Sequence, residues 1–314
     1  MSQSNISAAQ MSQDQISAEL RRHSKVVRLR RSLARFVRTQ PMGTLGAVVC
    51  IFLLLVAGFA DWIQVMDPKI IPDNSIPYQG PQFGDSWYNW GSDYLGRDVF
   101  SRVVAGAQLS LVVSFTANFW GTTLGIVWGI FQGYWGGTWF DTISQRFVEA
   151  LLTIPALIMA LTIMAVLGPS LQNIIFAIGL RYVGSGARTV RSSVLSVREN
   201  VYVDAAKAIG ASNKRILFLH IFPQVFSIYL ILLSLHVGGA ILAESSLSFL
   251  GMGAGPDEAT WGGLVTQGTQ QALYGGIPWL AIFPGTAIAL TVYGFNLFGD
   301  ALRDTLDPRL RGSR

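Results

Sequence analysis

Uncharged apolar runs alternate with polar segments along most of the chain. The run from Met42 to Ala60 has 19 residues without a charge, enough to cross a hydrocarbon core about 30 Å thick. The run from Val103 to Phe140 is also free of charge. Four more spans are predicted at 147–167, 171–190, 223–243 and 277–299. The pattern therefore predicts an all-α integral membrane protein with six transmembrane helices.

The basic residues indicate which side of the membrane each segment faces. Gly168 and Pro169 divide one long uncharged run, which reads either as a single tilted helix or as a hairpin of two helices. The hairpin places the basic region 181–222 inside the cell, whereas the single helix places it outside. With the hairpin, 20 of the 23 lysines and arginines lie inside and only three lie outside. This distribution obeys the positive-inside rule, so we expect both termini in the cytoplasm.

Composition agrees with a membrane protein, because 51% of the residues are hydrophobic and 13% are charged. Residues 1–40 are predicted to form a disordered tail and a basic amphipathic helix on the anionic inner surface of the membrane. A nucleic-acid-binding arm is the alternative, and the nearby first span favours the lipid surface. The remaining expected divisions are 41–102 (first helix and external loop), 103–305 (five-helix domain) and 306–314 (cytoplasmic tail).

The chain shows no pattern for catalysis, metal binding or a cofactor. Cys50 is the only cysteine, and the three histidines lack the spacing of metal ligands. No Gly-x-x-x-x-Gly-Lys-Ser/Thr sequence occurs, so we expect ATP to be bound and hydrolysed on another protein if it is used. The chain is therefore not predicted to be an enzyme.

The polar stretch from Asp204 to Pro223 separates two apolar runs and predicts two short helices that meet at a bend. Gly210 suits the left-handed position after a helix end, and Ser212 or Asn213 suits the cap of the next helix. Two adjacent alanines, Ala205 and Ala206, are expected to leave a flat patch that another protein can approach closely.

The same stretch resembles the EAA loop of permease subunits of ABC importers. That loop has an acidic residue, two alanines, a glycine four residues later and a proline 13 residues after the glycine. The matching positions, with the role in ATPase coupling that the resemblance implies, are Asp204, Ala205, Ala206, Gly210 and Pro223. The sequence departs from the family at Asp204, where glutamate is usual, at His220 and at Phe222. The coupling loop as a whole is expected over about 198–223.

Three further elements are similar to C-type permease subunits of peptide/nickel-class, binding-protein-dependent importers. The Tyr94–Arg102 segment resembles an "LGRDxxSR" element, and the segment that begins at Glu244 resembles "ESxLSFLGxG". The Phe295–Arg311 segment resembles the end of the same family. The four elements occur in the family's order over about residues 90–311.

The resemblance implies a type I ABC-importer permease fold in the bacterial inner membrane. It also implies three kinds of partner: a second homologous permease subunit, one or two ATP-binding subunits, and an extracytoplasmic solute-binding protein. The solute is expected to be a peptide or a similar small molecule. A stand-alone ion-coupled secondary transporter is the alternative, but it would need several acidic or histidine residues within the spans. An intramembrane enzyme would need a catalytic pair, which we do not find.

Within the run from Val103 to Phe140, glycines recur at every fourth position from residue 121 onward, which is typical of close helix packing in membranes. The glycines expected to pack in this way are Gly121, Gly125, Gly129 and Gly133, with Gly137 continuing the spacing.

Two charged residues are candidates to line a pathway, Arg181 and Glu244. Arg181 is expected about 15 Å along its helix, where an unpaired arginine costs roughly 2.5–3.5 kcal/mol or more. It either packs against a partner or snorkels to the surface, or it lines a cavity and meets a carboxylate of the solute. Glu244 either packs against nearby hydroxyl or backbone donors or takes part in solute binding.

Overall fold

The structure is a computed structural model that describes residues 34–306 apart from 35, 74, 83–87, 256 and 276. The tail and most of the basic segment predicted within residues 1–40, and residues 307–314, lie outside the described part. The described residues form helices and loops, with one isolated bridge between Ser92 and Asp98 and no strand. In chain order the elements are α2 (Pro41–Gly58), α3 (Ala60–Ile63), α4 (Val99–Tyr134), α5 (Trp139–Thr153), α6 (Ala156–Leu167), α7 (Leu171–Arg198), α8 (Val201–Ala208), α9 (Asn213–Ile216), the π-helical turn η1 (Leu217–Ile221), α10 (Phe222–Phe249), α11 (Trp261–Gly275) and α12 (Trp279–Leu306).

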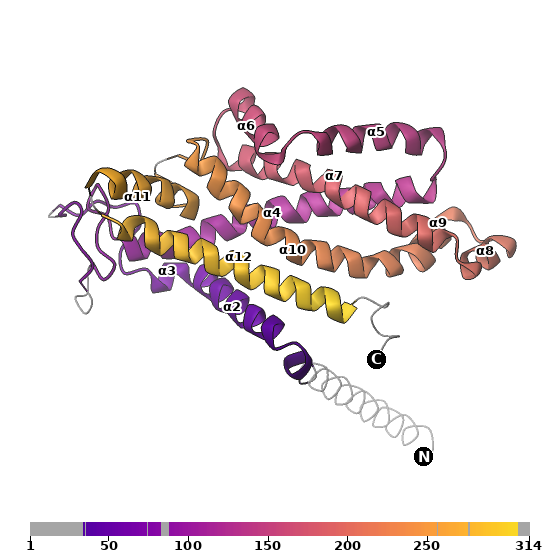
Figure 1. Cartoon of the computed structure of the whole chain (residues 1–314), viewed down its shortest axis with the longest axis horizontal. Helices are drawn as coiled ribbons and strands as arrows, with labels where there is room; N and C mark the ends of the chain where they lie inside the picture. Colours follow the sequence, from indigo (N-terminus) through magenta and orange to yellow (C-terminus); the bar gives the residue numbers. More distant parts are fainter. Residues whose placement is uncertain are drawn as a thin grey trace, which may run out of the picture.

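The long helices run back and forth along one direction (Figure 1). Helices α2 and α12 form one edge, α4, α7 and α10 form the centre, and α5 and α6 form the other edge. The short helices α8 and α9 lie at one end of this bundle, and α11 lies at the opposite end with the loop that follows α3. The predicted coupling loop, which contains α8 and α9, is thus separated by the full length of the bundle from α11 and the loop that follows α3.

Within the described part of the chain, four segments are long and apolar enough to cross a membrane: α2, α4, Asn213–Phe249 and α12. A fifth is obtained if α5 and α6 count as one span, although they are bent by 90°. The predicted continuous helix over 147–167 is therefore wrong, because α5 ends at Thr153 and Pro155 lacks the N–H that would extend it. Helix α7 has 28 residues but is not apolar enough to be counted among these spans.

The glycines of α4 lie against α7. A β-carbon at Gly125 would lie 2.6 Å from the carbonyl oxygen of Val183, and one at Gly129 would lie 2.6 Å from that of Ala187. Gly121 faces Gly179 in the same way, and Gly133 faces Val194. The two backbones approach so closely because these positions carry no side chain. Gly137 lies outside this contact, in the turn after α4 with a φ of +84°.

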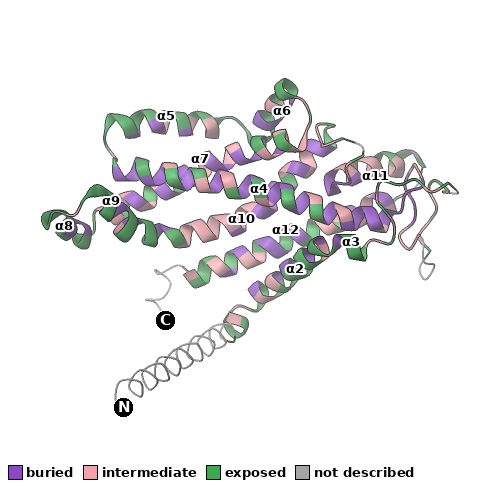
Figure 2. Ribbon diagram, turned by 180° about the vertical axis from the view of Figure 1, so that it is seen from behind, coloured by how far each residue is buried: buried purple, intermediate pink, exposed green. Residues whose placement is uncertain are grey.

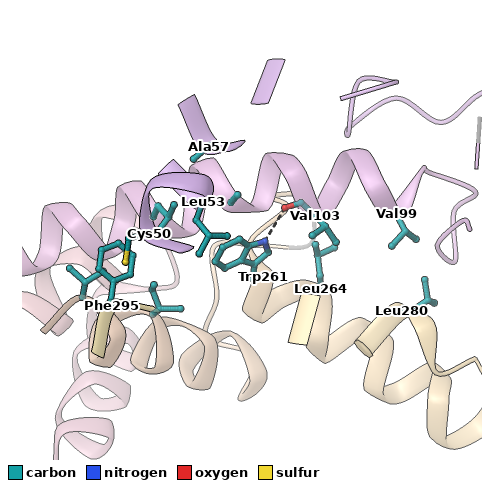
Figure 3. Packing of buried hydrophobic residues seen from close by; sticks show 13 residues of the cluster. Cys50, Leu53, Ala57, Val99, Val103, Trp261, Leu264, Leu280 and Phe295 are labelled. Atoms are coloured by element: carbon teal, nitrogen blue, oxygen red, sulfur yellow. Dashed lines mark hydrogen bonds between the residues drawn. The ribbon is translucent and has the colours of Figure 1, made fainter. Parts of the chain in front are cut away.

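A core around Trp261 joins α11 to α4 at the end of the bundle that holds the long loops (Figure 3). The indole Nε1 of Trp261 donates a hydrogen bond to the carbonyl oxygen of Val103 at 2.9 Å, and its backbone N–H donates to Ser110 Oγ at 3.0 Å. Leu264 and Leu280 extend the same core. These bonds hold the segment after α10 on the first turns of α4.

The element that resembles "LGRDxxSR" fastens the preceding loop to the start of α4. Asp98 caps α4 by accepting the N–H of Ser101 at 2.8 Å, and Ser101 Oγ accepts the N–H groups of Val65 and Met66 at 3.1 Å each. Burial raises the pKa of the Asp98 carboxyl, while the bonds from Ser101 act in the opposite direction. Arg102 is fully buried, 3.6 Å from Asp93. The expected loop 61–102 therefore ends inside the first turn of α4.

Candidate functional site

The segment from Asp204 to Pro223 forms the expected bend between two short helices, α8 and α9. Gly210 has a φ of +80°, which confirms the predicted left-handed position after α8. Ser212, one of the two expected caps, accepts the N–H of Arg215 at 3.4 Å. The π-helical turn η1 then leads into α10, in which Pro223 stands in the first turn. We call residues 201–221 the elbow.

The two alanines of the elbow face different surroundings, which corrects the expectation of one flat patch. Ala205 is exposed, whereas Ala206 is only 6% exposed and packs in a core with Ile216, Ile221 and Val225. The difference arises because residues one apart on a helix point about 100° from each other. Of the two alanines, only Ala205 therefore lies on the outer surface of α8.

The outer surface of the elbow is unusually apolar for a polar segment. Val201, at the start of α8, is 84% exposed, and Ile209, directly after its end, is 85% exposed. Figure 2 shows that much of α8 is exposed. Asp204, also exposed, forms an ion pair with Lys207 at 3.0 Å. An exposed apolar surface with a polar rim is typical of a contact with another protein.

Strong polar contacts join α4, α5 and α7, and one of them reaches the elbow. The guanidinium of Arg191 on α7 donates two hydrogen bonds of 2.7 Å to the carboxylate of Asp141 on α5. Arg198, at the end of α7, donates to the carbonyl oxygens of Tyr134 and Gly136 at 3.1 Å each. The hydroxyl of Tyr134 donates to Asn213 Oδ1 in α9 at 2.7 Å. The elbow is thus hydrogen-bonded to α4 through Asn213, and α7 is in turn bonded to Tyr134 of α4 and to α5.

One face of α7 is polar and uncovered, and we call it the polar face. Ser185, Thr189, Ser192 and Ser196 follow Arg181 at intervals of three or four residues. Thr189, Ser192 and Ser196 are exposed. The opposite face is apolar and fully buried, with Ala187, Val190 and Val194 at 0% exposure.

Helices α7 and α10 are antiparallel neighbours (Figure 1). Two cavities are lined by residues of both helices, and we call the space between the two helices the groove. The first, of about 350 Å³, is lined by α6, α7 and α10, with Arg181 among its lining residues. The second, of about 720 Å³, extends toward the elbow between α7, α10 and α12. Its polar lining residues are Thr189, Ser192, Ser193, Ser196, Asn200, Gln224, Ser227 and Arg303. The polar face of α7 therefore lines the groove in both cavities.

The two candidate pathway residues lie in different surroundings. Arg181 is half-buried in the first cavity, and its Nη1 lies 3.4 Å from the carbonyl oxygen of Leu152. Glu244 is 0% exposed and accepts a hydrogen bond from Ser248 at 2.9 Å. Its other oxygen has no hydrogen-bond partner among the described residues. Because its carboxylate is enclosed by the chain's own side chains, a role for Glu244 in a pathway stays a prediction.

Glu244 lies within α10, which continues to Phe249, six residues beyond the predicted end of this span at Ala243. His236 is also inside the bundle, with Nδ1 3.1 Å from Thr122 Oγ1 and its ring stacked on Tyr182 at 4.3 Å between centroids. The ionisable side chains of α10 thus point into the chain.

Sequence reasoning singled out Arg181 but missed the rest of the polar face. Tyr182, Thr189, Ser192 and Ser196 line the groove, and none of them belongs to a recognised element. The signal was present as hydroxyl-bearing residues at helical spacing after Arg181.

Known proteins share this arrangement of helices. A chain of a structure described as inward-facing conformations of the MetNI methionine ABC transporter superposes with a TM-score of 0.50 and 17% sequence identity. The match covers 66% of the present chain and 96% of that chain. The fold is accordingly the permease fold of type I importers.

The sequence comparisons identify the family. The family model described as "Binding-protein-dependent transport system inner membrane component" matches residues 121–312. The glutathione transport system permease protein GsiD of Escherichia coli O1:K1 / APEC is 39% identical over 279 residues, which is 88% of this chain and 90% of that protein. GsiD of Shigella dysenteriae serotype 1 is 38% identical over the same shares. The chain belongs to the family of binding-protein-dependent inner membrane transport components, and it is a permease rather than an enzyme.

Proposed function

We propose that this chain forms one half of the translocation pathway of an ATP-driven importer for peptide-like solutes. In this proposal the chain crosses the membrane six times, with both termini in the cytoplasm, and α5 with α6 forms the bent third span. Helix α7 is then the fourth span. The glutathione systems named for the relatives support a small, peptide-like solute.

The polar face of α7 is the observation that carries this proposal. A helix placed among five apolar spans cannot turn Arg181 toward lipid without a cost of roughly 2.5–3.5 kcal/mol, the value for an arginine near the centre of the membrane. The face therefore borders water or another protein. The groove between α7 and α10 supplies one wall of a pathway, and a second homologous permease subunit supplies the other wall.

The elbow supplies the connection to ATP hydrolysis. Its exposed apolar residues fit into a cleft of a separate ATPase subunit, and a solute-binding protein delivers solute at the opposite end of the bundle. Tyr134 joins the elbow to α4, and Arg198 and Arg191 join α7 to Tyr134 and to α5, so movement of the ATPase tilts those helices and changes which end of the groove is open.

The two alanines of the elbow offer a matched test. With Ala205→Arg, we expect normal amounts of the chain in the membrane but at least a tenfold loss of uptake, because the new side chain stands on the docking surface. With Ala206→Arg, we expect a smaller amount of folded chain, because a charge is placed in a closed core. Ala205→Ser is the control for the exposed position.

The measurements are the amount of chain in the membrane, recovery of the ATPase subunit with the purified chain, and ATP-dependent uptake into vesicles. Normal uptake by the Ala205→Arg variant would contradict docking at the elbow. ATP-independent uptake driven by an ion gradient would instead support the stand-alone transporter.

A further inference from the structure

The cavity of about 350 Å³ has an apolar wall and a single positive charge. Among the described residues that line it, Arg181 is the only charged one. Tyr182 and Ser246 also line it, but their hydroxyls donate to the carbonyl oxygens of His236 at 3.0 Å and Leu242 at 2.7 Å. The guanidinium of Arg181 is therefore the main source of free hydrogen-bond donors in this cavity.

Arg181 differs in its contacts from two other arginines of α7. Arg191 has a bidentate bond to Asp141, and Arg198 donates to two carbonyl oxygens. Arg181 has one long contact, 3.4 Å to Leu152, and forms no ion pair with another described residue. A guanidinium has five N–H donors, so most of those on Arg181 are left without a partner from the described part of the chain.

An unpaired guanidinium between apolar walls attracts an anion. Its planar fork matches the two oxygens of a carboxylate, and the bonds are strengthened where water is scarce. The volume of the cavity lies near the lower end of the range of about 300–1,000 Å³ that is typical of small-molecule sites. About two turns further along α7, Arg188 is exposed and also forms no ion pair with another described residue. Arg188 extends the positive charge toward the elbow.

We propose that Arg181 recognises a carboxylate group of the solute during its passage, so that the pathway selects carboxylate-bearing solutes. This inference rests on the proposed function, because it takes the groove between α7 and α10 as part of the pathway. The competing occupant is a carboxylate of the partner permease, and the experiment below separates the two.

The experiment measures the charge preference of the cavity without knowledge of the solute. Ala243 lines the cavity from α10, opposite α7, and the native Cys50 is buried in a different core. In the purified permease complex with Cys50→Ala and Ala243→Cys, the new thiol is treated with two methanethiosulfonates. One carries an anionic sulfonatoethyl group and the other a cationic trimethylammonioethyl group.

We measure the ratio of the reaction rate of the anionic reagent to that of the cationic reagent. We expect this ratio to be on the order of tenfold higher with Arg181 intact than after Arg181→Gln. The ratio of the two rates is used because removal of a cation also changes the pKa of the thiol, which affects both reagents alike. Arg181→Lys should keep most of the preference, since it keeps the charge.

Arg146→Gln is the matched control, because Arg146 is an exposed arginine on α5 that is paired with Glu149. This change should leave the ratio unaltered. A ratio that Arg181→Gln does not change would overturn the inference, as would a thiol at position 243 that reacts with neither reagent. Pairing of Arg181 with a carboxylate of the partner permease would also abolish the preference for the anionic reagent. Such a result would count against recognition of the solute by Arg181.

ATP-driven uptake by the parent complex is measured on the same preparation. Failure of that uptake would contradict the proposed function, whereas the rate ratio reports on Arg181 alone. The two proposals therefore fail by different observations.

Discussion

Helices α7 and α10 are antiparallel neighbours of equal length, 28 residues each, yet they place their polar side chains in opposite ways. In α10, Glu244 is fully buried, and His236 contacts Thr122 and Tyr182 inside the bundle. In α7, Arg181 is half-buried, and Arg188 and Thr189 are exposed. Glu244 and His236 of α10 thus point into the chain, whereas a whole face of α7 is left open.

This difference explains why α10 is apolar enough to be recognised as part of a membrane span, whereas α7 is not. An average over the residues of a helix mixes both faces, so the apolar face of α7 is hidden by its arginines. In a membrane protein, an amphipathic helix at the centre of the bundle indicates a face turned toward water or a partner. Three variants test this contrast between the covered and the open side of α7.

The largest effect is expected from Asp141→Ala, which removes the partner of Arg191 on the covered side of α7. Asp141 is 5% exposed and Arg191 24% exposed in their side chains, so the remaining charge is poorly solvated. We expect a loss of about 3 kcal/mol in the free energy of unfolding. Thermal unfolding of the purified chain in detergent, followed by circular dichroism, measures this loss.

Glu149→Ala is the control, because it breaks the pair with Arg146, whose side chain is 78% exposed. The expected loss is below about 1 kcal/mol. Equal unfolding temperatures for Asp141→Ala and the parent chain would show that the pair does not hold α7 in place.

A smaller effect is expected from Gly125→Val, which places a side chain between α4 and α7. Its β-carbon would lie 2.6 Å from a backbone oxygen, so the helices must separate. Overpacking of this kind costs typically about 1–3 kcal/mol. The same unfolding measurement tests it, with Gly58→Val as the control, since a β-carbon at Gly58 meets nothing within 4 Å. A loss no greater than that of the control would argue against close packing at this position.

The smallest effect on stability is expected on the open face, from Thr189→Val. The hydroxyl of Thr189 donates to the carbonyl oxygen of Ser185 at 2.9 Å, within its own helix, so its loss should change stability by less than about 0.5 kcal/mol. Uptake should fall about twofold, because a polar group of the groove is replaced by an apolar one.

Thr162→Val is the matched control on α6, where the hydroxyl bonds to its own helix in the same way, at 2.9 Å to Ile158. Thr162 lines neither cavity, so uptake should be unchanged. Similar uptake by the two variants would remove the functional distinction between the open face of α7 and the outer face of α6.

Local features of the site could be predicted from neighbouring residues. The left-handed Gly210 and the cap at Ser212 follow from turn chemistry that involves only a few positions. The bend between α5 and α6 was missed although Pro155 is visible in the sequence, because the apolar run was read as continuous. A proline within such a run is compatible with either a kink or an end, and neighbouring helices decide between them.

Contacts between distant segments could not be predicted. Ala205 and Ala206 are the same residue type in the same motif, but Ala206 packs on residues 10 to 19 positions later, in α9, η1 and α10. Arg102 and Arg181 both appear as charges near spans, yet one is fully buried beside Asp93 and the other lines a cavity.

By itself the sequence determined the helical membrane class, the family and the turn chemistry of the elbow, because hydropathy, charge bias and short motifs depend on residues close together in the chain. Only the tertiary structure decided which face of α7 is open, which alanine is exposed and where Glu244 lies. Those properties depend on which helices cover each face, and that covering arises from the packing of α4, α6, α7 and α10 across more than 100 residues of sequence.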